Sequence, residues 1–191
     1  MKPLATLVAL AVITHPLAAQ VEHVTDQFAR SEVWFTKEIG LAKLEQNRCD
    51  IWLVFGVERT KQTTTEFVRL DYLSVSGPVG SSKPLGLLAD VTLQFALADS
   101  MLSGQAFHPA TADKKLVVKS YSPTRTDFPP RGDIEQSFFY ALPSGTLQLL
   151  ADGSAKMRTQ GPERTCDAAL DGRAQRAVKA LQAAVDSARV H

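Results

Sequence analysis

Residues 163–190 read ERTCDAALDGRAQRAVKALQAAVDSARV, and this stretch is the clearest indication of the architecture of the chain. Beyond Ala168 its charged side chains and its apolar side chains separate onto two sides of a helix with 3.6 residues per turn. The apolar positions recur at steps of three and four, at Leu170, Ala174, Val178, Leu181, Val185 and Ala188. We therefore predict a C-terminal amphipathic helix that needs an apolar surface to cover this stripe.

Cys166 lies near the start of that stretch, and the only other cysteine of the chain is Cys49. Two cysteines in an exported protein most simply form one disulfide. The sequence therefore predicts a Cys49–Cys166 bridge, with two separate buried thiols as the alternative.

The first 19 residues have the three parts of a secretory signal peptide. Lys2 precedes an apolar run from Leu4 to Ile13, and small residues follow as far as Ala19. The run is about half of the ~20 residues that a membrane-spanning helix needs. We predict cleavage after Ala19 and export to the periplasm or the extracellular space; a retained membrane anchor is the alternative to cleavage. Residues 20–191 are predicted to form one domain, and the protein is not expected to be an integral membrane protein.

The middle of the chain is rich in the patterns of β-strands. The best example is the segment 90–99, where Val91, Leu93, Phe95 and Leu97 alternate with small or polar residues. A helix over residues 88–102 is the alternative for that segment. The other predicted strands are residues 51–57, 66–74, 116–121, 134–142, 146–151 and 154–159, and a turn at Asp152–Gly153 joins the last two into a hairpin.

Residues 21–46 predict a helix, because Val21, Val24, Phe28, Phe35 and Ile39 fall roughly on one helical face; a strand over residues 32–39 is the alternative. The predicted fold class is therefore α+β. It has a curved antiparallel sheet of six to seven strands, an N-terminal helix, and a C-terminal amphipathic helix that packs on the strand 90–99.

The balance of charge argues against nucleic acid as a partner. Without residues 1–19 the chain has 20 basic and 20 acidic residues. A group of these alternates along two predicted strands and is interpreted as cross-strand ion pairs on a solvated face. The group comprises Glu58, Arg59, Lys61, Glu66, Arg69 and Asp71.

The common catalytic and cofactor motifs are absent from the sequence, so no cofactor is predicted. His108 and Asp113, which share one polar loop, are the only candidates for a catalytic pair, and a plain surface histidine is the alternative. No metal site is predicted, because His108 has no evident companions as ligands.

Aromatic residues on the predicted strands are the candidates for a ligand pocket between the sheet and the C-terminal helix. They are Trp52, Phe55, Phe67, Tyr72, Phe95 and Phe139. The alternative is that they fill an ordinary core. The leading hypothesis is an exported binding protein for a small apolar or amphipathic molecule or for an envelope protein; a cell-envelope hydrolase and a structural protein-interaction module are the alternatives.

Overall fold

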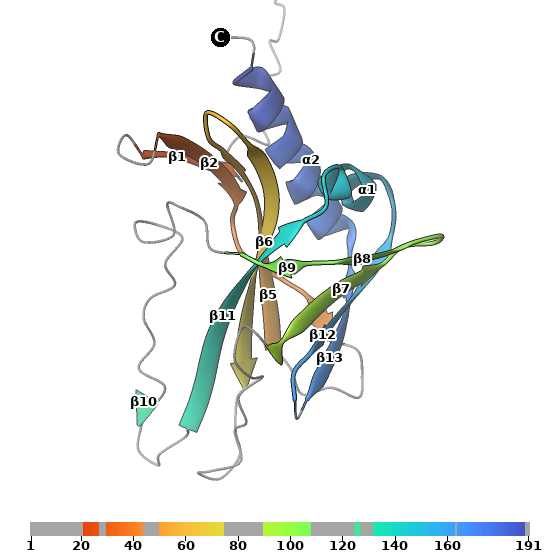
Figure 1. Cartoon of the computed structure of the whole chain (residues 1–191). Helices are drawn as coiled ribbons and strands as arrows, with labels where there is room; N and C mark the ends of the chain where they lie inside the picture. The colour runs from red at the N-terminus through yellow and green to blue at the C-terminus, as the bar shows by residue number, and fades with distance from the viewer. Residues whose placement is uncertain are drawn as a thin grey trace, which may run out of the picture.

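The computed structural model describes residues 21–26, 30–43, 50–74, 90–107, 125–126, 132–162 and 164–189. These residues form two antiparallel sheets and two helices, which is an α+β arrangement as predicted (Figure 1). The larger sheet has the strand order β1-β2-β5-β6-β11-β10, and the smaller sheet has the order β4-β13-β12-β7-β8. The predicted signal peptide, the strand 116–121 and the pair His108 and Asp113 lie outside the described residues.

The elements follow one another along the chain with these bounds. They are β1 (Val21–Asp26), β2 (Ser31–Thr36), β3 (Ile39–Gly40), β4 (Ala42–Lys43), β5 (Asp50–Arg59), β6 (Thr64–Ser74), β7 (Thr92–Ala96), β8 (Met101–Ser103), β9 (Gln105–Ala106), β10 (Arg125–Thr126), β11 (Gly132–Leu142), α1 (Thr146–Asp152), β12 (Ala155–Gln160), β13 (Thr165–Leu170) and α2 (Gly172–Ser187). Within the described ranges, β5, β6, β7, β11 and β12 confirm five of the predicted strands.

Two corners join the sheets. At Leu41 the chain leaves β3, which pairs with β5, and enters β4, which pairs with β13 of the smaller sheet. At Gly104 it leaves β8, which pairs with β7, and enters β9, which pairs with β11 of the larger sheet. A Cβ at Gly104 would lie 2.7 Å from the Cβ of Tyr140, so glycine permits the close approach of the two strands there.

The core lies between the sheets, against the face of the larger sheet that we call the inner face. Alternate residues of each strand point into it, among them Leu53, Phe55 and Val57 of β5. Leu93 and Phe95 of β7 meet them from the smaller sheet, as the alternation of residues 90–99 predicts. One continuous apolar cluster therefore includes both sheets and both helices.

Helix α2 confirms the predicted C-terminal amphipathic helix, although it begins at Gly172 and residues 165–170 form β13 instead. The carboxylate of Asp171 caps it by accepting hydrogen bonds from the backbone N–H groups of Arg173 (2.9 Å) and Ala174 (3.3 Å). Its buried stripe contains Val178 and Leu181, and the helix packs against β1, β2, β5, β13 and α1. These partners correct the prediction that the helix packs chiefly on residues 90–99.

The predicted N-terminal helix is wrong, because β1 and β2 form an antiparallel pair in its place (Figure 1). The alternative, a strand over residues 32–39, corresponds to β2. Val33 and Phe35 point to the outer face of the larger sheet, while Trp34 between them points to the core. Since both faces of β2 are buried, its apolar residues are consecutive, and the strand alternation is hidden in the sequence.

The predicted hairpin over residues 146–159 is also corrected, because residues 146–152 form helix α1. The carboxylate of Glu66 on β6 accepts hydrogen bonds from the backbone N–H groups of Gly145 (2.9 Å) and Leu147 (2.8 Å). A residue some eighty positions away thus provides the cap that this short helix lacks in its own sequence.

Cys166 on β13 is completely buried in the core, and the described residues contain no free thiol. Its predicted partner, Cys49, lies outside the described residues, so the Cys49–Cys166 bridge stays a prediction. None of the helices in the described ranges is long and apolar enough to span a bilayer.

Candidate functional site

The six aromatic candidates do not line one cavity. Phe55, Tyr72 and Phe95 are completely buried in the core between the sheets. Phe67 and Phe139 belong to a separate apolar cluster on the opposite, outer face of the larger sheet. Trp52 is only partly buried and lies beside Gly40. Its Nε1 would be 3.3 Å from a Cβ added at Gly40. The prediction of a single aromatic pocket between the sheet and the helix is therefore not supported by their placement.

The outer face of the larger sheet has its own apolar layer. Phe67 is completely buried in it, and its ring lies over Gly56, where any added Cβ would overlap the ring. Val33, Phe35 and Val54 complete the buried part. A residue without a side chain thus creates the space that an aromatic ring on the neighbouring strand fills.

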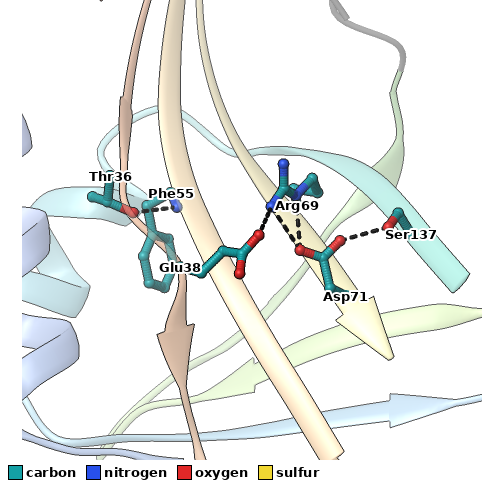
Figure 2. Close-up of polar contacts among 6 residues, drawn as sticks. All are labelled: Thr36, Glu38, Phe55, Arg69, Asp71 and Ser137. Carbon is teal, nitrogen blue, oxygen red and sulfur yellow. Dashed lines mark hydrogen bonds and ion pairs between the residues drawn. The ribbon is translucent and has the colours of Figure 1, made fainter. Parts of the chain in front are cut away.

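Beside this apolar layer lies a buried charged network, drawn in Figure 2. The guanidinium of Arg69 donates to Oδ2 of Asp71 through Nε (2.9 Å) and Nη2 (2.7 Å), and Nη2 also donates to Oε1 of Glu38 (2.8 Å). The hydroxyl of Ser137 donates to Oδ1 of Asp71 at 2.5 Å. The side chains of Arg69 and Asp71 are 7% and 6% exposed, whereas that of Glu38 is 62% exposed.

Sheet geometry brings these groups together. Arg69 and Asp71 are two residues apart on β6 and therefore share a face. Ser137 on β11 lies directly opposite Asp71 in the antiparallel register. The sequence prediction placed this alternation of charges on a solvated face, and the burial of Arg69, Asp71 and also Glu58 corrects it.

A β-bulge positions Glu38. Phe35 pairs with Gly56 and Ile39 pairs with Leu53. Ile39 is four residues beyond Phe35, whereas Leu53 is only three residues from Gly56, so the β2–β3 side has one extra residue. The extra residue pushes the segment 37–38 out of the ladder, and Oγ1 of Thr36 accepts the N–H of Phe55 at 3.1 Å (Figure 2). Bulges of this kind re-aim side chains and are frequent next to functional sites.

Burial dominates the electrostatics of Asp71. Loss of solvent raises the pKa of its carboxyl above the ordinary value, although the charge of Arg69 and the hydrogen bond from Ser137 act in the opposite direction. A buried ion pair contributes little to stability when its desolvation is counted. Arg69, the charge partner of this perturbed carboxyl, lines a neighbouring hollow, which makes the ion pair a functional-site candidate.

A hollow of about 410 Å³ opens directly over this network, and we call it the outer hollow. Its floor is apolar, formed by Phe35 and Val54, both of which are buried. Charged groups of both signs stand around the floor. The lining residues are Glu22, Phe35, Thr36, Lys37, Glu38, Val54 and Arg69.

On the other side of the bulge is a second hollow of about 260 Å³, which we call the helix groove. It lies between β3 and the first turns of α2. The lining residues are Lys37, Glu38, Ile39, Gly40, Arg173, Arg176 and Ala177. Three of the four charged side chains in this list are cationic.

A third hollow, of about 330 Å³, lies on the smaller sheet beside the exposed Met101. Arg158 and Asp167 form a cross-strand ion pair at its edge, with Nε–Oδ1 at 2.7 Å and Nη2–Oδ2 at 2.9 Å. The hydrogen bond from Arg158 lowers the pKa of Asp167. Arg158 and Asp167 satisfy each other, which leaves the exposed Lys156 as the remaining charged side chain that lines this hollow.

The described residues contain no group of three His, Cys, Asp or Glu side chains that could hold a metal ion. His23 is occupied in a stack on Trp34, with ring centroids 4.6 Å apart. The catalytic candidates His108 and Asp113 lie outside the described residues, and the hydrolase hypothesis stays a prediction.

Comparisons of this chain with protein-family models, curated proteins and solved structures found no match. Among the described residues, the outer hollow and the helix groove are therefore the two candidate sites.

Proposed function

We propose that the chain is an exported binding protein whose outer hollow holds a small amphipathic molecule with a positively charged end. The bulge is the observation that carries the proposal. It holds the exposed carboxylate of Glu38 over a buried ion pair, at the edge of an apolar floor. This arrangement gives a ligand one apolar contact area and one charged contact.

The size and floor of the outer hollow suit a small molecule. Ligand sites commonly have volumes of about 300–1,000 Å³ and combine an apolar lining with a few polar groups that fix orientation. The outer hollow has a volume of about 410 Å³, with Phe35 and Val54 beneath it. Phe35 and Val54 are 7% and 2% exposed, so they offer an alkyl or aryl group a small apolar contact whose burial would favour binding.

The charge balance decides the sign of the polar end. The positive charge of Arg69 is already matched by Asp71, with which it makes two contacts below 3 Å. Counted together, Asp71, Glu38 and Glu22 carry three negative charges against the two positive charges of Arg69 and Lys37, and Oε1 of Glu38 is itself bound to Arg69. An ammonium group can bind to Glu38 without displacing it, whereas an anionic group must compete with Glu38 for Arg69.

A set of three probes of equal chain length tests the proposal: octylammonium and octanoate below their critical micelle concentrations, and octanol below its solubility limit. Calorimetry or backbone NMR titration should show that octylammonium binds most tightly. Glu38→Gln should weaken its binding about tenfold, which corresponds to about 1.4 kcal/mol. Glu32→Gln is the matched control, since Glu32 is also partly exposed and pairs with an arginine, Arg59, at 3.8 Å outside the outer hollow.

The outcomes separate the parts of the proposal. Tightest binding of octanoate would overturn the assigned charge. If none of the three probes binds, or if Glu32→Gln weakens binding as much as Glu38→Gln, the outer hollow is not the site. Export is tested separately, by the N-terminal sequence of the protein recovered from the expression host: a start at Gln20 is expected.

A further inference from the structure

We infer that the helix groove is a second binding site, which takes an oxyanion such as a phosphate or carboxylate group. The groove lies on the opposite side of the bulge from the outer hollow, and the inference does not depend on the proposed ligand there. It rests on three cationic side chains that converge on one hollow from two elements, and on how few carboxylates face them.

The helical contribution comes from one face of α2. Arg173, Arg176 and Ala177 are three and four residues apart and therefore stand together on the helix. Lys37 reaches the same hollow from the bulge. Ile39 and Ala177 are both buried, and they form an apolar base below the cations.

The cations of the groove are only partly neutralised. Arg173 pairs with Asp171 through Nε (2.8 Å) and donates from Nη2 to the backbone oxygen of Gly40 (3.2 Å), which fixes its guanidinium at the wall. Glu38, the only acidic lining residue, directs Oε1 to Arg69 on the outer face. Within the described part of the chain, Lys37 and Arg176 make no ion pair, so two positive charges are available to an anion.

The chemistry of these side chains defines the ligand class. A guanidinium presents several N–H donors in a plane and matches the paired oxygens of a carboxylate or phosphate, and lysine adds a flexible point charge. The start of α2 is not itself the anion site, because Asp171 already accepts the N–H groups of Arg173 and Ala174. The side chains of the groove, rather than the helix end, would hold the oxyanion.

Titrations of the full chain with inorganic phosphate and with phenyl phosphate, followed by backbone NMR, test the inference. We expect saturable shifts confined to residues 37–40 and 173–177, and about tenfold weaker binding in the double variant Lys37→Gln/Arg176→Gln. The matched control is Lys61→Gln/Arg189→Gln, which removes the same charge at exposed positions away from the groove. Equal weakening in both double variants would show a mere effect of net charge and overturn the site.

Two further arms distinguish the source of the oxyanion and the independence of the two sites. Vesicles of phosphatidylcholine with and without phosphatidylglycerol are tested in parallel; binding only to the anionic vesicles, lost in Lys37→Gln/Arg176→Gln, assigns a lipid headgroup. Binding to none of these probes overturns the inference. The single variant Arg176→Gln should weaken phosphate binding yet leave octylammonium binding unchanged, since Arg176 does not line the outer hollow.

Discussion

The two faces of the larger sheet are built on different principles. The inner face is apolar throughout its described centre, and Phe55 and Tyr72 pack there against the smaller sheet and the helices. The outer face combines a small apolar layer with the buried pair Arg69–Asp71 and an open hollow. Packing on the inner face accounts for the stability of the fold. The charges of the outer face cost desolvation energy, which a purely structural surface would avoid.

The largest expected effect concerns the inner face. Cys166→Ala should lower the free energy of unfolding by about 4–5 kcal/mol if the predicted bridge to Cys49 closes a loop of more than one hundred residues. Urea unfolding under oxidising conditions measures this loss. Wild type under reducing conditions is the control, because it loses the bridge but keeps the buried sulfur atom. Equal melting of wild type with and without reductant would show that no bridge contributes.

Arg69→Met comes next in magnitude and tests the outer face. It leaves the carboxylate of Asp71 buried without its cation, so we expect a loss of about 3 kcal/mol at neutral pH. The double variant Arg69→Met/Asp71→Leu removes both charges and should recover most of that loss, as measured by urea unfolding. If the double variant is as unstable as the single one, the pair is structural, and the contrast between the two faces disappears.

The sequence is most informative where one face of an element is packed and the other is not. Strand β7 is predicted correctly because Val91, Leu93 and Phe95 enter the core while the residues between them stay outside it. Strand β2 is predicted only as the alternative to a helix, because Trp34 is buried on one side of the sheet and Val33 on the other. When both faces of a strand are buried, its apolar residues are consecutive. Its hydrophobicity then has no periodicity that distinguishes a strand from a helix.

The candidate site depends on relations that are not local in the sequence. The alternation of Arg69 and Asp71 is visible, but only the tertiary structure buries them. The bulge that brings Glu38 to Arg69 follows from the register between β2–β3 and β5, which no single segment encodes. Likewise, Glu66 can cap the start of the helix over residues 146–152 only because the fold brings β6 close to Gly145.

The smallest expected effect is the pH dependence of Asp71, which tests whether burial or ion pairing dominates on the outer face. Burial raises the pKa of this carboxyl, so the native state keeps its proton to higher pH than the unfolded chain does. The contribution of Asp71 to stability is therefore fully present below the ordinary pKa near 3.8 and is lost as the pH rises through the raised value.

Asp71→Asn isolates this contribution, because asparagine has the shape of the protonated acid but does not titrate. The unfolding free energy of wild type minus that of Asp71→Asn should fall as the pH is raised from about 3 to 7. Asp171→Asn is the opposite control. Burial of Asp171 is outweighed by hydrogen bonds from Arg173 and from two backbone N–H groups, which lower the pKa of this carboxyl. The unfolding free energy of wild type minus that of Asp171→Asn should therefore rise as the pH is raised toward about 4. A difference for Asp71 that also rises with pH would mean that pairing with Arg69 outweighs burial, and the outer face would then be stabilised by its charges.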